Sequence, residues 1–203
     1  MTNIKICGMT SLSDIQCVND NAVEFAGFVM FIPKSKRNLS AETAAELLPV
    51  LNRDIKSVAV VVSPTVEQLR EIERIGFDYI QIHGTLRGEV LEAAKIPILR
   101  AFNVSNMDEF EKYHDNDKIA GFVFDAAEPG SGKVFDWSLV KHIECPASKI
   151  MLLAGGLNPD NVAKAVEYLH PYGVDVSSGV ENADGKGKDP ALVRDFVSKV
   201  RQM

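Results

Sequence analysis

Short runs of β-branched and other apolar residues alternate along the chain with longer stretches whose apolar residues recur every three or four positions. The first pattern is typical of buried β-strands and the second of amphipathic helices. Strands are predicted over residues 3–7, 24–30, 55–62, 78–82, 97–102, 119–124, 149–154 and 173–178. Helices are predicted over residues 11–21, 40–51, 65–76, 86–95, 107–114, 136–143, 159–170 and 189–200. Ser40, Ser63 and Asp136 are candidate N-caps for three of these helices.

Eight strands that alternate with eight helices predict an α/β fold, either a closed (β/α)8 TIM barrel or a large doubly wound sheet. The barrel is favoured because the number of units equals its strand number. The length of 203 residues also lies near the lower limit of this fold, roughly 200 residues. No linker, charge block or low-complexity segment interrupts the sequence. We therefore expect residues 1–203 to form a single barrel domain with short loops.

The composition supports a packed core and argues against several classes of partner. Hydrophobic residues make up 46% of the chain and the formal net charge is −6. Duplex nucleic acid is disfavoured as the main partner because a phosphate backbone needs a basic face. No apolar run approaches the roughly 18–20 residues of a membrane helix, and no signal-peptide pattern begins the sequence. Three widely spaced cysteines (Cys7, Cys17, Cys145) and scattered histidines suit reduced thiols in a cytoplasm and give a metal site weak support.

Small, polar and ionisable residues follow the predicted strands, at positions that meet on the active-site face of a barrel. Gly155 and Gly156 follow the seventh strand, and Ser177, Ser178 and Gly179 end or follow the eighth. These two loops hold a substrate phosphate in many barrels, since glycine lets backbone N–H groups approach an anion closely. The glycines could instead serve only tight turns. Two such groups in these two loops favour binding of a small phosphorylated metabolite.

The alternation of side chains along a strand assigns the residues of the first strand to opposite faces. Ile4 and Ile6 should pack on the helices, which leaves Lys5 and Cys7 pointing into the barrel. Asp125 ends the apolar sixth strand, three steps around the ring from the first. A thiol and a carboxylate should therefore face each other across the site, an arrangement suited to general acid–base chemistry.

Two further expectations concern the charges around this site. Asp175 on the eighth strand borders the first strand in a closed barrel, so we expect it to pair with Lys5 below the site. The Cys7 thiol has an ordinary pKa of about 8.5 and must ionise to act as a base. Some local stabilisation of its thiolate is therefore expected, whereas Cys17 and Cys145 are expected to be small apolar residues.

Several short motifs occur in order from residue 4 to about residue 200. They are KICG (5–8), PKSKR (33–37), QIHG (81–84), FD (124–125), FDW (135–137), AGGLNPDNV (154–162), VDVSSGVE (174–181) and KDPALVRDF (188–196). Each motif is weak alone, but in this order they are highly specific. Together they resemble the phosphoribosylanthranilate isomerase family, the barrel enzymes of tryptophan biosynthesis.

The resemblance implies an Amadori rearrangement of N-(5-phosphoribosyl)anthranilate to 1-(2-carboxyphenylamino)-1-deoxyribulose 5-phosphate. By resemblance, Asp125 is the general acid that opens the furanose ring. Cys7 is the general base that removes the C2′ proton. No cofactor or metal is implied, because the protonated imine of the substrate serves as the electron sink.

The resemblance also assigns the residues that bind the substrate. Arg37 is expected to contact the anthranilate carboxylate, because a guanidinium binds a carboxylate through paired hydrogen bonds. Gln81 and His83 are expected to line the pocket. The phosphate role falls on the glycines and serines already described: Gly155, Gly156, Ser177, Ser178 and Gly179. The expected partner is a small phosphorylated substrate, with no nucleic acid or membrane, and the expected assembly is a monomer or homodimer.

Two departures and three rival functions complete the sequence interpretation. The loop 126–133 reads AAEPGSGK, where the family commonly has a GGTG-like sequence, and Lys36 replaces a common proline. Indole-glycerol-phosphate synthase would require catalytic lysines at strand ends, and ribulose-phosphate epimerase would require metal-binding histidines; neither set is present. A barrel that only binds a phosphorylated metabolite is the non-enzyme alternative.

Overall fold

Strands and helices alternate along the chain as the hydrophobic pattern predicts. The computed structural model describes residues 1–103, 107–125 and 136–203. The strands are β1 (Asn3–Cys7), β2 (Phe25–Met30), β3 (Asn38–Leu39), β4 (Lys56–Val62), β5 (Tyr79–His83), β6 (Ile98–Asn103), β7 (Ile119–Asp125), β8 (Ile150–Leu153) and β9 (Gly173–Val176). The α-helices are α1 (Leu12–Asn19), α2 (Ala41–Leu47), α3 (Val66–Ile75), α4 (Gly88–Ala93), α5 (Val162–Leu169) and α6 (Pro190–Arg201). Short 3₁₀ helices are η1 (Leu48–Val50), η2 (Met107–Lys112), η3 (Trp137–Leu139) and η4 (Ser178–Val180).

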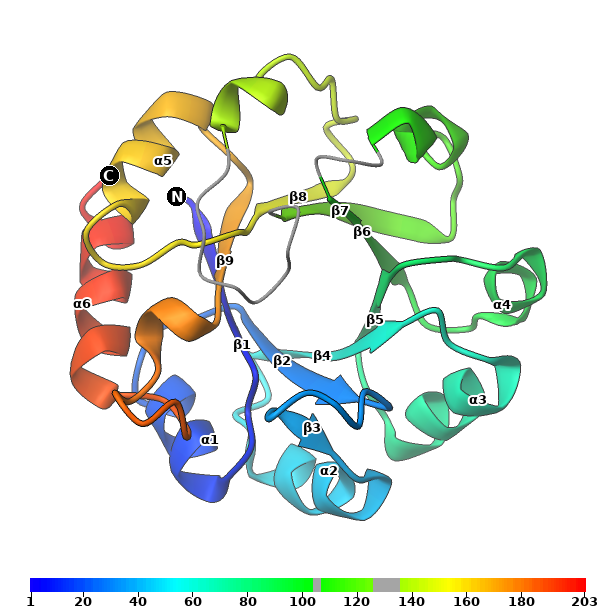
Figure 1. The fold of residues 1–203 in the computed structure, drawn as a ribbon, viewed down its shortest axis with the longest axis horizontal. Coiled ribbons are helices and arrows are strands. Elements are labelled where there is room, and N and C mark those ends of the chain that lie inside the picture. The colour runs from blue at the N-terminus through cyan, green and yellow to red at the C-terminus, as the bar shows by residue number, and fades with distance from the viewer. Residues whose placement is uncertain (104–106, 126–135) are drawn as a thin grey trace.

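The long strands form a closed parallel barrel with the helices around it (Figure 1). Their order is β1-β9-β8-β7-β6-β5-β4-β2, and β2 pairs again with β1 to close the ring. The two-residue strand β3 lies beside the end of β2, outside the predicted set. The predicted (β/α)8 TIM barrel is therefore confirmed.

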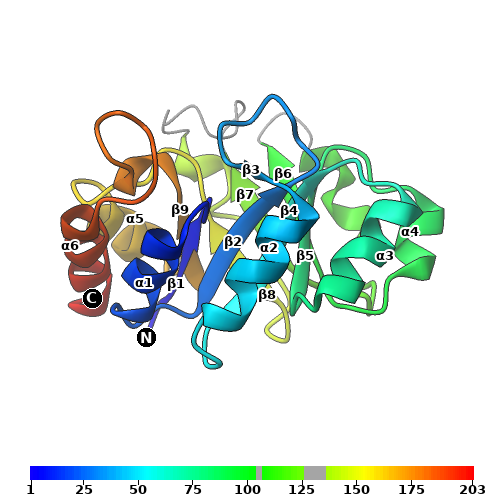
Figure 2. The same cartoon turned by 90° about the horizontal axis from the view of Figure 1, so that it is seen from below.

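Burial on both sides of the barrel wall follows the alternation of side chains. Ile4 and Ile6 are fully buried in the large apolar cluster between strands and helices, whereas Cys7 belongs to the cluster inside the barrel. Val123 likewise faces inward, and its neighbours Phe122 and Phe124 face the helices. The sequence assigned these faces correctly. Figure 2 shows the loop after β2 at one end of the barrel and both chain ends at the other.

Two of the predicted helices are shorter and tighter than expected. In the described residues, the segments 107–114 and 136–143 contain only the 3₁₀ helices η2 and η3. In the first segment, the aromatic rings of Phe110 and Tyr113 are both buried. Phe110 lies within η2 and Tyr113 follows its last residue, so the two rings attach this short segment to the apolar core. No described helix is long and apolar enough to cross a membrane.

The helix caps agree with the sequence in two of three cases. The Ser40 and Asp136 side chains accept hydrogen bonds from the backbone at the starts of α2 and η3. Ser63 was the wrong choice for α3, because Thr65 caps it in a capping box with Gln68. The Ser63 hydroxyl instead accepts a hydrogen bond from the Thr85 backbone N–H, which joins the loops after β4 and β5.

Candidate active site

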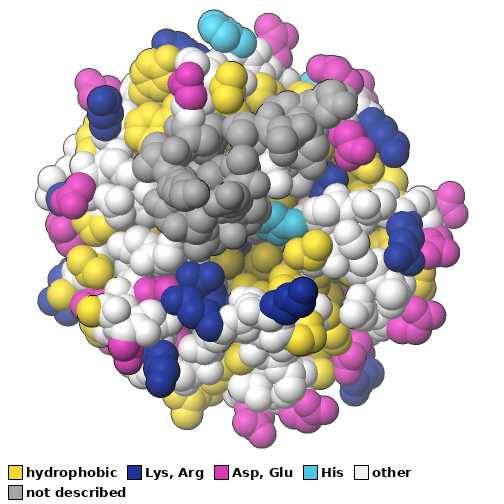
Figure 3. Space-filling model, viewed as in Figure 1, with side chains coloured by type: hydrophobic (Ala, Val, Ile, Leu, Met, Phe, Trp, Pro, Cys, Tyr) yellow, Lys and Arg dark blue, Asp and Glu magenta, His cyan; other side chains and the backbone are white. Residues whose placement is uncertain are grey.

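A cavity opens at the end of the barrel where the strands finish. Its volume is about 490 Å³, which is within the usual range for small-molecule sites, roughly 300–1,000 Å³. Its described wall consists of the carboxyl ends of the barrel strands and the loops that follow them. Figure 3 looks onto this end, where apolar side chains lie in the open part of the hollow and Lys and Arg side chains stand at its rim.

The structure brings together nearly all of the predicted site residues. Those on the cavity wall are Cys7, Arg37, Gln81, His83, Asp125, Gly155, Gly156, Ser177 and Ser178. Gly179 does not belong to the described wall. A Cβ atom at this position would overlap the carbonyl oxygen of Leu157, so the glycine lets the loop after β9 pack against the loop after β8. Its position supports a role in joining the two predicted phosphate loops rather than in lining the cavity.

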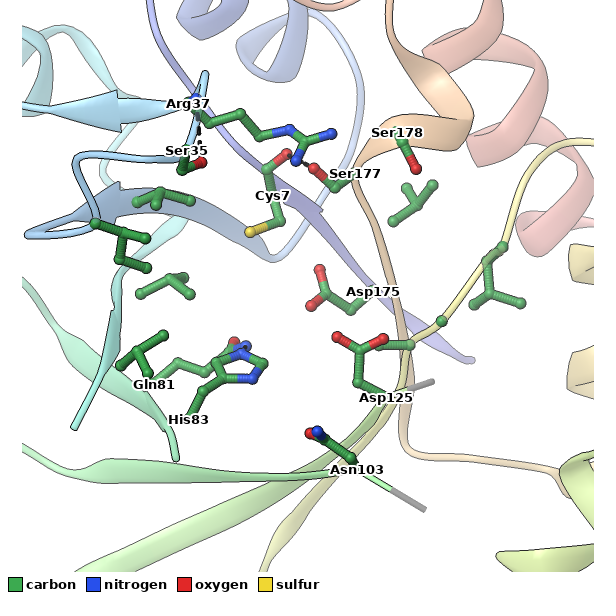
Figure 4. A pocket seen from close by; sticks show the side chains of 18 of the residues that line it. Cys7, Ser35, Arg37, Gln81, His83, Asn103, Asp125, Asp175, Ser177 and Ser178 are labelled. Carbon is green, nitrogen blue, oxygen red and sulfur yellow. Dashed lines mark hydrogen bonds between the residues drawn. The ribbon is translucent and has the colours of Figure 1, made fainter. Parts of the chain in front are cut away.

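Cys7 and Asp125 approach the cavity from opposite parts of the wall. Cys7 ends β1 and Asp125 ends β7, and two strands, β9 and β8, separate them around the ring. Both side chains point into the same space, together with the carboxylate of Asp175 (Figure 4). This arrangement can place a substrate between a thiol and a carboxylate.

A buried ion pair lies below the cavity. The Lys5 Nζ donates a hydrogen bond of 2.9 Å to the Asp175 Oδ2 across the β1–β9 pair, where the two residues are direct neighbours. The Lys5 side chain is fully buried. Burial alone would lower the pKa of Lys5, but the negative charges of Asp175 and of an ionised Cys7 outweigh it and raise this pKa. The predicted pair is therefore confirmed, and it places a positive charge beneath the thiol.

The family model for N-(5′-phosphoribosyl)anthranilate isomerase matches residues 4–199. The chain belongs to the phosphoribosylanthranilate isomerase family. An isomerase of this name from Acetivibrio thermocellus is 42% identical, with 100% of this chain and 97% of the relative covered. One from Streptococcus pneumoniae is 37% identical, with 99% and 96% covered.

Solved structures of phosphoribosylanthranilate isomerases have the same fold over the whole chain. The enzyme from Thermotoga maritima superposes with a TM-score of 0.86 at 31% identity, with all of both chains covered. Another isomerase structure, at a TM-score of 0.82 and 30% identity over 100% of both chains, is a complex with reduced 1-(o-carboxyphenylamino)-1-deoxyribulose 5-phosphate.

The thiol of Cys7 in this isomerase is harder to ionise than the sequence suggests. Burial raises the pKa of Cys7, and the positive charges of Lys5 and Lys188 offset this effect only in part. The expected local stabilisation of the thiolate is present, from Lys5 and Lys188, but burial outweighs it. The physical reason is desolvation, which disfavours the charged form of a buried thiol and cannot be read from the sequence.

Gly27 on β2 fixes where the thiol lies. A Cβ at Gly27 would stand 2.7 Å from the Cys7 Sγ and 3.1 Å from the Lys5 Nζ. We expect Gly27→Ala to displace the thiol and lower the isomerase kcat/KM by roughly 10²-fold, the cost of a misplacement of about 1 Å. Steady-state kinetics with thermal unfolding would measure this.

The matched control is Ala26→Gly, on the same strand but facing the helices. It should lower stability by about 1 kcal/mol while leaving kcat/KM within about threefold. Equal activity of Gly27→Ala and wild type would show that the close approach at Gly27 does not fix the thiol.

His83 and Gln81 form a neutral polar pair on the opposite wall. Their side chains are joined by a hydrogen bond of 2.8 Å between the Gln81 Nε2 and the His83 Nε2. Burial and the positive charges of Lys5 and Arg100 lower the pKa of His83 to about 4, so the imidazole is neutral at pH 7.

The two predicted phosphate loops present mainly backbone groups to the cavity. Gly155 and Gly156 adopt the left-handed backbone conformation, with φ angles of 83° and 67°. The Ser177 hydroxyl donates to the Cys7 carbonyl oxygen at 2.9 Å, so it ties this loop to the end of β1. The Ser178 side chain also lies on the wall (Figure 4). Anion binding there would rely chiefly on N–H groups.

Sequence reasoning missed several residues around the site. Asn103 lies on the cavity wall, and the strand-end rule could have found it because it is the polar residue that ends β6. Glu181 and Lys188 form a buried ion pair. Both lie in the motifs 174–181 and 188–196, but these motifs do not indicate that the two side chains pair. Among the described residues, no group of three or more His, Cys, Asp or Glu side chains could hold a metal ion.

Proposed function

We propose that this chain catalyses the isomerisation of N-(5′-phosphoribosyl)anthranilate to 1-(2-carboxyphenylamino)-1-deoxyribulose 5-phosphate in tryptophan biosynthesis, with Asp125 as general acid and Cys7 as general base. The observation that carries the proposal is that both side chains point into one cavity from strands three steps apart. Membership of the isomerase family supports the same reaction.

Asp125 begins the reaction by protonating the ring oxygen of the phosphoribosyl group. The C1′–O bond breaks as the lone pair of the anthranilate nitrogen forms a double bond to C1′. The product of this step is an open-chain protonated imine. A carboxyl group at a strand end can give up its proton without rearrangement of the barrel, which is what a positioned general acid requires.

Cys7 then acts as a thiolate and removes the proton from C2′. The electrons of the C2′–H bond move to the imine carbon and nitrogen, which gives an enolamine. Protonation at C1′ and loss of the hydroxyl proton at C2′ give the ketone. The protonated imine accepts the electron pair, so this sequence requires no cofactor or metal.

The remaining wall residues bind the two ends of the substrate in this proposal. Arg37 holds the anthranilate carboxylate, because its guanidinium offers paired donors. The backbone of the loops at Gly155, Gly156 and Ser178 holds the phosphate at the other end. Neutral His83, with Gln81, contacts the part of the substrate between them. Gly179 supports the phosphate loops by packing.

The setting of the enzyme is part of the same proposal. We infer a single barrel domain over residues 1–203 that acts in the cytoplasm as a monomer or homodimer. The cysteines Cys7, Cys17 and Cys145 are free, as suits a reducing compartment. A similar structure, at 32% identity and a TM-score of 0.83, is of monomers generated from the dimeric isomerase of Thermotoga maritima.

The decisive test follows the fluorescence of N-(5′-phosphoribosyl)anthranilate, generated in place from anthranilate and phosphoribosyl pyrophosphate by the transferase. Folded wild-type protein should consume it with multiple turnovers and form the ketone product, identified by its conversion with indole-glycerol-phosphate synthase. Binding of the substrate without turnover would favour the alternative of a barrel that only binds phosphorylated metabolites.

A further inference from the structure

A buried carboxylate holds together two of the loops around the cavity. Glu181 follows the 3₁₀ helix η4 and is 9% exposed. Its Oε1 accepts a hydrogen bond of 2.5 Å from the Arg37 Nε, and its Oε2 accepts one of 2.8 Å from the Lys36 Nζ. The Lys188 Nζ is 3.4 Å from the Oε1. One carboxylate therefore faces three cationic side chains.

The surrounding charges keep Glu181 ionised. Burial alone would raise the pKa of this carboxyl, but the hydrogen bonds from Arg37 and Lys36 and the charge of Lys188 outweigh it and lower the pKa to about 2. An ionised carboxylate accepts strong, directional hydrogen bonds from a guanidinium. The contact with Arg37 is thus present throughout the neutral pH range.

The same contact determines how Arg37 faces the cavity. Glu181 binds the Nε side of the guanidinium, and the Arg37 side chain, only 14% exposed, extends over Gly8 toward Ser177 (Figure 4). A Cβ at Gly8 would lie 2.6 Å from the Arg37 Cδ, so the aliphatic part is closely packed. No described residue accepts a hydrogen bond from the two terminal guanidinium nitrogens. They are available to a ligand in the cavity that Arg37 lines.

We propose that Glu181 is a positioning residue that fixes the Arg37 guanidinium so that its two terminal nitrogens bind a carboxylate of the substrate, and that it thereby makes the cavity selective for carboxylate-bearing substrates. The identity of that carboxylate, the one on the anthranilate ring, rests on the proposed function. The selectivity arises because Arg37, without the Glu181 contact, has several rotamers and only some present both nitrogens to the ligand.

The test compares two ligands that differ only in the carboxylate. One is reduced 1-(o-carboxyphenylamino)-1-deoxyribulose 5-phosphate, and the other is its phenylamino analogue without the carboxyl group. Wild-type protein should bind the first more tightly by roughly tenfold to hundredfold, the usual worth of a hydrogen-bonded charge pair. Glu181→Gln should reduce this ratio to within about threefold of unity and leave binding of the phenylamino analogue nearly unchanged, as measured by calorimetry.

Matched variants separate positioning from general stabilisation. Glu46→Gln makes the same change at an exposed position on α2 and should keep the wild-type ratio. In an Arg37→Met background, Glu181→Gln should have no further effect on the ratio, because Glu181 acts through Arg37. Thermal unfolding identifies any variant that is not folded. Glu181→Asp, which keeps the charge but shortens the reach, replaces Glu181→Gln if that variant does not fold.

Three results would overturn the proposal: a wild-type ratio near unity, a wild-type ratio retained in Glu181→Gln, or equal weakening of both ligands by that variant. None of these measurements requires turnover. If wild-type protein distinguishes the two ligands but does not isomerise the substrate, the proposed reaction fails and the role of Glu181 remains. If wild-type protein isomerises the substrate and Glu181→Gln keeps the wild-type ratio, the proposed reaction stands and the role proposed for Glu181 fails.

Discussion

Cys7→Ala and Asp125→Asn are each expected to lower kcat by roughly 10²–10⁴-fold, the usual contribution of a positioned acid or base. Both residues lie at the mouth of the barrel, where neither carries the packing of the large outer core. Asn keeps the size of Asp125 but has no acidic proton at neutral pH. Ala removes the only thiol on the described cavity wall. The substrate fluorescence assay, with far-ultraviolet circular dichroism as a check on folding, measures both effects.

Cys17→Ala is the matched control for the thiol. Cys17 is 5% exposed and packs on the outer side of the barrel in α1, so its loss should cost some stability and leave kcat unchanged. Because acid and base act in successive steps on one substrate, the double variant should be much less than additively impaired. Wild-type turnover by either single variant would refute the mechanism while leaving the assignment of the reaction intact.

Lys5→Met is expected to lower the free energy of unfolding by about 3–5 kcal/mol, because it leaves the Asp175 carboxylate buried without its partner. Lys56→Met makes the same change in the surface pair with Asp78, where both side chains are largely exposed, and should cost at most about 1 kcal/mol. Urea denaturation at pH 7 compares the two.

The double variant Lys5→Met/Asp175→Leu distinguishes the cost of an unpaired charge from the value of the pair itself. Replacing both partners by apolar residues should restore most of the stability. A single Lys5→Met variant as stable as wild type would mean that water or another group solvates Asp175 in solution.

The pH dependence follows from the same buried pair. Since burial raises the pKa of Cys7, the ionised fraction of this thiol in wild-type protein should increase by about tenfold per pH unit between pH 6 and 8, and the proton-removal step should follow that fraction. Removing the Lys5 charge raises the pKa further, so the rising limb should move to higher pH in Lys5→Met. The raised pKa of Lys5 also sets the pH dependence of stability. The contribution of Lys5 to the free energy of unfolding is complete below the ordinary lysine pKa of 10.5, and it is lost as the pH rises from there through the higher pKa of the folded state. An unchanged activity profile in Lys5→Met would contradict the electrostatic role.

The barrel could be predicted from the sequence because the same pattern, an apolar strand followed by an amphipathic helix, recurs along the chain. Alternation of side chains placed Ile4 and Ile6 outside and Lys5 and Cys7 inside, and each strand repeats that rule with a packed core to enforce it. The helices before and after the 126–135 segment were less predictable. Their short stretches combine weak periodicity with a large cost of helix initiation, so the sequence does not distinguish an α-helix from a 3₁₀ helix there.

The candidate site was predictable in position but not in electrostatics. Strand-end residues can be located from the alternation, which is why Asp125 and His83 were found. The pKa values of Cys7 and His83 depend on burial and on charges from several strands, information that exists only after folding. Glu181 was missed for a related reason. It is 144 residues from Arg37 in the chain, and a contact over that distance leaves no local pattern.

The burial of Cys7 has a consequence for the chemical durability of the enzyme. Thiolates, not thiols, react with peroxides and alkylating agents. A base that is 8% exposed and protonated in the resting state presents little reactive sulfur to such reagents. The same raised pKa makes the thiolate a stronger proton acceptor once it forms beside the substrate. Basicity during turnover and resistance to oxidation between turnovers thus have one physical origin, the desolvation of the Cys7 thiol.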